Sequence, residues 1–433
     1  MQELIAVAVF VGAYVLIATD WVDRVVVALT GAGLMLGLRI VDVEEAFHSE
    51  KYGVDWGVIG LLLGMMVIVA VLAETGVFDY LGIRAAQRAR GRPFRILVVL
   101  VLLTAIASSL LDNVTTVLLV APVTIQVTRR LGVPTVPYLI AEALASNIGG
   151  AATLVGDPPN IIIASRAGLS YGDFLVHLAP VVLVLLVVFI ATMRLLFRRS
   201  LVSDESQVSA LMRLDARASI TDPALLARGL SVLAVVTVAF VAHTVTHLEP
   251  AVIALLGAGV LLLIARRDTG PFLVHVEWGT LAFFVGLFIM VGALAKTGAV
   301  DRIAAALAAA TGDSVPRAAF LLLVGSAVLS ALVDNIPYVA TMAPVVSSLI
   351  GDLHGPYDPD VLWWALALGA DLGGNATLIG ASANVVIAGA AGREGYPIRF
   401  LDFAKYGIPV TVLTVAVSAG YLWLRYFVFG GAA

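Results

Sequence analysis

The chain has 433 residues, of which 61% are hydrophobic and only 13% are charged, and its formal net charge is -4. Because ordinary soluble domains carry about 25% charged residues, this composition excludes an ordinary soluble protein. The weak negative charge without a block of basic residues excludes nucleic-acid binding of the usual kind, and the absence of cysteine excludes disulfides and thiolate metal sites.

Apolar runs of helical length recur along the whole chain, which is typical of an all-α polytopic membrane protein. In the first half, unbroken spans are predicted at 4–19, 25–41, 56–75 and 181–197, with surface helices at 76–92 and 171–178. In the second half, they are predicted at 230–247, 252–264, 278–296 and 408–426, with a surface helix at 298–312. The hydrophilic stretch 200–227 is expected to be a linker between the halves, which comprise 1–199 and 228–433.

Each half also contains two apolar limbs that are separated only by an Asp-Asn pair. The limbs over 94–130 meet at Asp112-Asn113, and those over 318–350 meet at Asp334-Asn335. A full crossing would leave the pair at the far membrane face, whereas a re-entrant hairpin would leave it near mid-depth. Hydropathy alone does not choose between these two arrangements.

A discontinuous helix is predicted after each pair of limbs. The run 136–167 is interrupted at Gly149–Asn160, and the run 361–391 is interrupted at Asp371–Asn384. Glycine, proline and polar residues fill both interruptions. We therefore expect two half-helices around an unwound middle in each half of the chain.

The two halves repeat one another. A shift of 222 residues gives 11 identities in 33 positions from 54–86 onto 276–308, and eight in 16 from 108–123 onto 330–345. A shift of 224 aligns Gly149-Gly150 with Gly373-Gly374 and Asn160 with Asn384. Chance similarity between apolar helices would not keep these polar and small residues in step, so the sequence predicts an internal repeat.

The predicted topology follows from the number of crossings. If both hairpins are re-entrant, each half crosses the membrane five times, so the second copy is inverted, which is the plan of many secondary transporters. Of the 26 Lys and Arg residues, 19 then fall on one face and seven on the other. The positive-inside rule makes the richer face cytoplasmic. We predict ten transmembrane spans, two broken helices and two re-entrant hairpins, with the linker inside and both termini outside.

Four carboxylates lie at the predicted breaks. Bare backbone polar groups cost several kcal/mol each in hydrocarbon, and an intramembrane carboxylate is a functional hypothesis by default. The predicted carriers of a proton or cation are Asp112, Asp334, Asp157 and Asp371, of which Asp112 and Asp334 come first. The alternative is that these residues only cap helix ends.

Carboxamides and glycines accompany the carboxylates and are predicted to bind the substrate. Asn side chains both donate and accept hydrogen bonds, the freed N–H groups at helix starts carry partial positive charge, and glycine allows close backbone approach. The predicted substrate-binding residues are Asn113, Thr115, Asn147, Gly149, Gly150, Asn160, Asn335, Gly373, Gly374, Asn375 and Asn384. Because Asp157 aligns with Ala381 and Asn147 with Asp371, the halves need not bind the same group.

The motifs resemble those of the ArsB/P-protein branch of the ion transporter superfamily, which includes ArsB/NhaD-type permeases and citrate-transporter-like proteins. The matching stretches are 111–116, 147–153, 156–160, 334–337 and 372–384. The resemblance implies an elevator-type carrier, in which a transport domain of hairpins and broken helices slides against a scaffold. Carboxylate carriers of the superfamily have Ser-Asn-Thr at the hairpin tips, where this chain has Asp112 and Asp334 in place of the serine.

These observations predict a secondary transporter in the lipid bilayer of the cytoplasmic membrane that moves a small inorganic substrate and protons. Proton-coupled export of arsenite or antimonite is the first hypothesis, sodium/proton antiport the second, and an organic or inorganic anion carrier the third. A channel would need a continuous polar stripe, and an enzyme would need a nucleophile or a metal set. We therefore predict neither, and no cofactor or metal. A homodimer or a partner ATPase is compatible with the sequence, although the chain itself has no nucleotide-binding motif.

Overall fold

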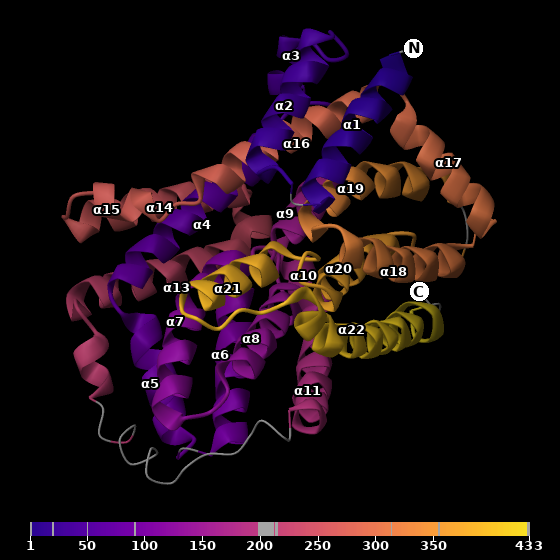
Figure 1. Cartoon of the computed structure of the whole chain (residues 1–433). Helices are drawn as coiled ribbons and strands as arrows, with labels where there is room; N and C mark the ends of the chain where they lie inside the picture. The colour runs from indigo at the N-terminus through magenta and orange to yellow at the C-terminus, as the bar shows by residue number, and fades with distance from the viewer. Residues whose placement is uncertain are drawn as a thin grey trace.

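The computed structural model describes residues 2–19, 21–49, 51–90, 92–197, 212, 215–312, 314–353 and 356–430 (Figure 1). Within these residues the chain forms helices and no strand. Residues 200–211 and 213–214 of the predicted linker lie outside the described residues, as do 198–199 before it. Its last part contains the short helix η1 (Ala216–Ser219) and the start of the next long helix.

The elements of the first half follow the predicted order. They are α1 (Gln2–Thr19), α2 (Arg24–Gly37), α3 (Val43–His48), α4 (Trp56–Glu74), α5 (Val77–Arg88), α6 (Pro93–Leu110), α7 (Asn113–Leu131), α8 (Thr135–Gly150), α9 (Pro158–Ala167), α10 (Tyr171–His177) and α11 (Ala179–Leu196). The predicted limbs over 94–130 correspond to α6 and α7, and the predicted broken helix 136–167 corresponds to α8 and α9.

The second half has the same order of long and short helices. They are α13 (Pro223–Thr246), α14 (Pro250–Ala265), α15 (Gly270–Val274), α16 (Trp278–Lys296), α17 (Ala299–Thr311), α18 (Val315–Leu332), α19 (Asn335–Asp352), α20 (Val361–Gly373), η2 (Gly374–Ala376), α21 (Ser382–Arg393), α22 (Phe400–Leu422) and the π-helical turn η3 (Trp423–Val428). The limbs over 318–350 correspond to α18 and α19, and the broken helix 361–391 corresponds to α20, η2 and α21.

Eight helices in the described part of the chain are long and apolar enough to cross a membrane. They include α6, α7 and α18, which are three of the four limbs that the prediction treats as re-entrant. Three further apolar helices, α1, α2 and α14, are shorter. The chain is therefore a multi-pass membrane protein, whereas the count of ten spans stays a prediction.

Two predicted features have the wrong boundaries, the end of the second span and the ends of the helix interruptions. The span predicted to reach Val41 ends at Gly37, because Arg39 takes a left-handed conformation (φ 53°) and Asp42 then caps α3. Both helix interruptions are shorter than predicted, because α8 continues to Gly150 and α9 already begins at Pro158. Proline suits a first helical position, where its missing N–H is not needed.

The shorter interruptions change the setting of three predicted site residues. Asn160 and Asn384 lie in the first turns of α9 and α21, and Asp371 lies in the last turn of α20. These polar residues therefore belong to helix ends and not to unwound backbone. Helix ends leave backbone groups without intrahelical partners. Polar side chains gather there because they can form hydrogen bonds with these groups.

Helices that are equivalent under the 222-residue shift make equivalent contacts. α2 packs on α16 as α14 packs on α4, and α7 packs on α21 as α19 packs on α9. In Figure 1, α2 and α16 lie together at the top of the view, while α4 and α14 lie together at the left. Within each half, α6 packs on α8 as α18 packs on α20. The contacts between the two halves thus occur in reciprocal pairs.

Glycines allow the closest of these crossings. A Cβ atom at Gly64 of α4 would lie 2.5 Å from the backbone of Ala254 in α14, and one at Gly286 of α16 would lie 2.7 Å from the backbone of Ala28 in α2. Small residues at helix crossings let backbones approach closely in membrane proteins. The two crossings fix α2, α4, α14 and α16 as one connected group.

Candidate functional site

The Asp157 carboxylate lies where the two Asp-Asn corners meet. It precedes α9 and is fully buried. Asn113, at the start of α7, donates to its Oδ2 at 2.8 Å, and Asn335, at the start of α19, donates to its two oxygens at 3.3 Å each. Residues that are 222 positions apart in the chain therefore contact the same carboxylate.

Asn147 extends this contact into a network between the halves. Its Oδ1 accepts from Asn113 at 3.1 Å, and its Nδ2 donates to Asn375 at 3.0 Å and to Asn384 at 3.2 Å. All of these side chains are buried. The structure thus brings five predicted carboxamides and one predicted carboxylate into one cluster, which we call the central cluster: Asn113, Asn147, Asp157, Asn335, Asn375 and Asn384.

Asp371 is the second carboxylate beside the central cluster. It is fully buried at the end of α20 and interacts electrostatically with Asp157. Neither of its carboxylate oxygens accepts a hydrogen bond within normal geometry among the described residues, although the Asn160 side chain interacts with the carboxylate. Oδ1 of Asn113 and Oδ1 of Asn160 also have no hydrogen-bond partner among these residues. Every one of these unpartnered atoms is a hydrogen-bond acceptor when the carboxylate is ionised.

Asn160 and Asn384 stabilise the two interruptions. Asn160 donates to the carbonyls of Gly150 and Thr153, and Asn384 donates to the equivalent carbonyls of Gly374 and Thr377. Each amide thus satisfies two carbonyls that the unwound chain leaves free. Both residues therefore also have a structural role.

The predicted glycines serve helix packing. Gly149 lies against the backbone of Ala105 in α6, and Gly373 lies against that of Ala327 in α18. Gly150 and Gly374 each face the carbonyl of the glycine that ends the interruption, Gly156 and Gly380. The structure therefore places these glycines at backbone contacts, where no larger residue fits.

Asp112 and Thr115 contact one another and not the central cluster. Asp112 is the N-cap of α7, with its Oδ1 accepting from the backbone N–H of Thr115 at 2.8 Å and its Oδ2 accepting from the Thr115 hydroxyl at 2.6 Å. Both carboxylate oxygens are thus occupied. This geometry is that of a helix cap.

Asp334 has partners that the sequence did not indicate. It caps α19 through the N–H of Ile336 and accepts from the Ser382 hydroxyl. Arg24, at the start of α2, lies 3.5 Å from its Oδ2 and also donates to Ser382. No local signal could have revealed this ion pair, because its partners are 310 positions apart in the sequence.

Replacement of Asp112 should separate helix capping from ion carriage. Asn and Asp cap helices about equally well, so Asp112→Asn should keep wild-type stability and transport. Asp112→Ala should lower the stability by about 1 kcal/mol, because α7 loses its cap. Thermal unfolding in detergent and proton flux in liposomes measure the two quantities. Loss of proton flux in Asp112→Asn would show that Asp112 carries the proton or cation.

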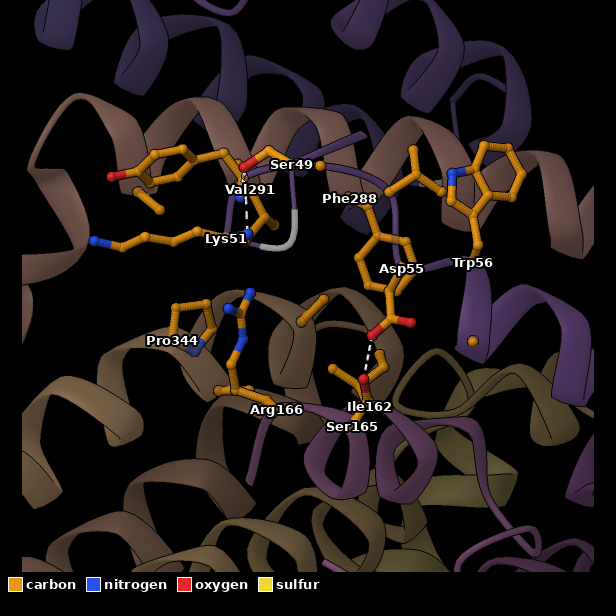
Figure 2. Close-up of a pocket in the computed structure, with 18 of the residues that line it drawn as sticks. Ser49, Lys51, Asp55, Trp56, Ile162, Ser165, Arg166, Phe288, Val291 and Pro344 are labelled. Atoms are coloured by element: carbon orange, nitrogen blue, oxygen red, sulfur yellow. Dashed lines mark hydrogen bonds between the residues drawn. The ribbon is translucent and has the colours of Figure 1, made fainter. Parts of the chain in front are cut away.

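A cavity of about 670 Å³ lies between the start of α4 and the helices α9 and α19 (Figure 2). Lys51 in the loop before α4 and Trp56 at the start of α4 border it, and α9 borders it with Arg166 and Ser165, of which Ser165 donates to Asp55 across the gap. Ile162 and Ala340 also line it. They lie five residues after Asp157 and Asn335, which is roughly 7 Å along a helix axis. The cavity thus borders α9 and α19, the two helices at whose starts Asp157 and Asn335 lie.

A resident metal site is not evident in the described part of the chain, where no group of three or more His, Asp or Glu side chains could hold an ion. The central cluster and the neighbouring Asp371 combine two carboxylates with carboxamides and include no Lys, Arg or His. Such a site can exchange protons and can offer oxygen atoms to a small cation or to a ligand with hydroxyl groups.

The chain is similar to membrane proteins of mycobacteria and to the P proteins of mammals. It is 53% identical over 427 residues to the uncharacterized transporter Rv2684 of Mycobacterium tuberculosis, covering 99% of both chains. It is 51% identical over 427 residues to the 46 kDa membrane protein of Mycobacterium leprae, covering 99% of this chain and all of that one. It is also 34% identical over 508 aligned positions to the human P protein, covering 99% of this chain and 60% of the P protein.

Solved transporter structures share the fold. The YdaH transporter of Alcanivorax borkumensis superposes with a TM-score of 0.60 at 14% identity, covering 95% of this chain and 98% of that one. MtrF of Neisseria gonorrhoeae, described as an antimetabolite efflux pump, superposes with a TM-score of 0.53 at 13% identity, covering 95% of both chains. The profile of the CitMHS family, described as citrate transporters, matches residues 14–369. With this match and these relatives, the resemblance to the ArsB/P-protein branch is confirmed, and the chain belongs to the CitMHS family of membrane transporters, within the ion transporter superfamily.

Proposed function

We propose that the protein is an ion-coupled secondary transporter in which Asp157 and Asp371 carry a proton or a monovalent cation in exchange, with sodium/proton antiport as its activity. The observation that carries the proposal is the buried Asp371 carboxylate, which has no hydrogen-bond partner among the described residues and lies beside Asp157. Two neighbouring carboxylates cannot both stay ionised without compensation. A proton or a cation supplies that compensation.

The geometry favours Asp157 and Asp371 over the carboxylates ranked first from the sequence. Asp112 is occupied by Thr115, and Asp334 is paired with Arg24. A carrier group has to load and release its ion. Asp371 has both oxygens free for this, and Asp157, although it accepts hydrogen bonds from Asn113 and Asn335, is the carboxylate beside it. The coupling role of Asp112 and Asp334 stays a prediction, which the Asp112 variants test.

Export of arsenite or antimonite is the second candidate. Neutral As(OH)₃ offers hydroxyl donors, and the unpartnered atoms at the site are acceptors on Asn113, Asn160 and Asp371. An anion carrier is less well supported, because an anionic substrate would meet two carboxylates and no cationic side chain within the cluster. Arg24 is already engaged by Asp334 at its edge.

An inverted repeat and an elevator movement are part of the proposal. The reciprocal helix contacts between the halves support the repeat, as do the equivalent bonds of Asn160 and Asn384. The cavity between the α3–α4 loop and α9 with α19 supports a sliding boundary, because it lies between residues of α4 and α16, from the group of crossed helices, and residues of α9 and α19, at whose starts Asp157 and Asn335 lie. We infer ten spans in the bacterial inner membrane, with the arginine-rich face inside.

Everted membrane vesicles with acridine orange test the proposed exchange. Respiring vesicles are acidic inside and quench the dye, and addition of sodium chloride should restore fluorescence as protons leave. Choline chloride at the same concentration and vesicles without the protein are the controls. A response to arsenite but not to sodium would replace antiport by arsenite export. No response to either would reject both candidates.

A further inference from the structure

A line of buried hydroxyl and carboxyl groups runs along α7 and α8 and is not used by the central cluster. Its members are Thr124 and Thr128 on α7, and Thr135, Glu142 and Ser146 on α8. Their relative exposure is between 0% and 3%. Glu142 is the titratable member, and a buried intramembrane carboxyl group marks function by default.

Hydrogen bonds connect this line to one end of the protein. Glu142 accepts from the Thr124 hydroxyl. One turn later, the Thr128 hydroxyl donates to the Thr124 carbonyl at 2.8 Å and lies 2.9 Å from the Thr135 hydroxyl. Thr135 in turn interacts with the Tyr396 hydroxyl, which accepts from Arg129 at the exposed end of α7.

The other end of the line reaches the central cluster. Ser146 follows Glu142 by one helical turn on α8, and its hydroxyl donates to the backbone carbonyl of Asn113 at 3.0 Å. The side chain of Asn113 donates to Asp157. The second oxygen of Glu142, Oε2, has no hydrogen-bond partner, and Glu142 forms no ion pair, in the described part of the chain.

The second half of the chain shows that the fold does not require these groups. Because α19 packs on α20 as α7 packs on α8, each position has a counterpart. The residues equivalent to Thr124, Thr128, Glu142 and Ser146 are Val346, Ile350, Leu366 and Ala370. Four polar residues in one half are thus apolar in the other, although the helix pairing is the same. A packing role does not explain a buried acid that leaves one oxygen unsatisfied.

We propose that Glu142 is a proton-relay residue, which takes up a proton and releases it again in each transport cycle, between the Tyr396 end of the protein and the central cluster. The inference rests on the proposed proton coupling. The proton binds the free Oε2 of Glu142 while Oε1 keeps the hydrogen bond from Thr124, so one O–H bond forms on uptake and the same bond breaks on release. The Thr128 and Ser146 hydroxyls donate to backbone carbonyls and position the two helices without carrying the proton.

Transport by the purified protein in liposomes tests the relay with two separate readouts. Sodium-driven proton flux is followed with a trapped pH dye, and exchange of radioactive sodium for sodium is measured at constant pH. Glu142→Gln should reduce proton flux by roughly a hundredfold, the lower range for a positioned acid–base group, while sodium exchange keeps its wild-type rate. Wild-type proton flux in Glu142→Gln would overturn the relay, and so would loss of both activities. Absence of both activities in the wild type would instead reject sodium/proton antiport.

Infrared spectroscopy tests the same residue without any substrate. In a titration with bulk pH, the purified protein should show a protonated-carboxyl band that Glu142→Gln removes and that Thr124→Val shifts in frequency, because the Thr124 hydroxyl bonds this carboxyl group. Thr104→Val is the matched control, because Thr104 is an equally buried hydroxyl that bonds only the carbonyl of Leu100 in its own helix. An unchanged band in Glu142→Gln, or one that does not follow bulk pH, would overturn the proposal even if the transported ion is not sodium.

Discussion

Asp157→Asn should reduce sodium-driven proton movement to the level of protein-free liposomes. The substitution removes a titratable group to which both Asp-Asn corners donate. It also places the new amide NH₂ group opposite the donor groups of Asn113 and Asn335. A buried donor left without an acceptor costs about 1–3 kcal/mol. The melting temperature in detergent should therefore fall, yet the protein should stay folded and monodisperse.

Asp112→Asn is the matched control for this experiment. It removes a buried carboxylate at the start of another helix, α7, and Asp112 makes no hydrogen bond to the central cluster. Asp371→Asn should behave like Asp157→Asn in transport. It should cost less stability, since no described residue donates a hydrogen bond to Asp371. Wild-type proton movement in both Asp157→Asn and Asp371→Asn would remove the carrier role from this pair.

Gly149→Ala and Gly373→Ala should strongly destabilise the protein. A Cβ atom would lie 2.3 Å from the carbonyl oxygen of Ala105 in the first case and 2.5 Å from that of Ala327 in the second. Backbone cannot move aside as a flexible side chain can, so α6 and α18 would have to separate from α8 and α20. Overpacking of this kind costs about 1–3 kcal/mol or more. Thermal unfolding and size-exclusion profiles in detergent measure the effect.

Gly325→Ala provides the comparison for both variants. Gly325 lies on α18, and a Cβ atom there would meet nothing within 4 Å. Because alanine favours helix over glycine by about 1 kcal/mol, this variant should be as stable as the wild type or slightly more stable. An unchanged melting temperature in Gly149→Ala would show that the close approach of α6 and α8 is not needed.

The sequence located the polar residues of the site well, because each lies at a break in an apolar run. Asp112 and Asp334 were expected at helix starts, and both cap the helices that follow them. The sequence ranked these two carboxylates above Asp157 because they align between the halves. It could not reveal that Asp157 accepts hydrogen bonds from both Asn113 and Asn335, since a hydrogen bond between residues 178 positions apart leaves no local pattern.

Other parts of the fold depend on tertiary contacts or on the membrane itself. The helix interruptions came out too long, because glycine and aspartate are helix-weakening residues whose cost is offset here by the contacts of Gly149, Gly150 and Asn160. The number of spans could not be settled from hydropathy, because α6, α7 and α18 are as apolar as a span. Whether such a limb crosses or turns back depends on the position of its corner in the bilayer.

The unsatisfied carboxylate of Asp371 bears on how tightly the two ion movements are linked. If the carrier crossed the membrane without a bound ion, two neighbouring negative charges would move through a medium of low polarity. This costs far more free energy than moving a neutral pair. Futile cycling is therefore suppressed by electrostatics alone. A tight stoichiometric exchange would then require no separate gate, and Asp371→Asn, which weakens this repulsion, should let sodium cross without an exchanged proton.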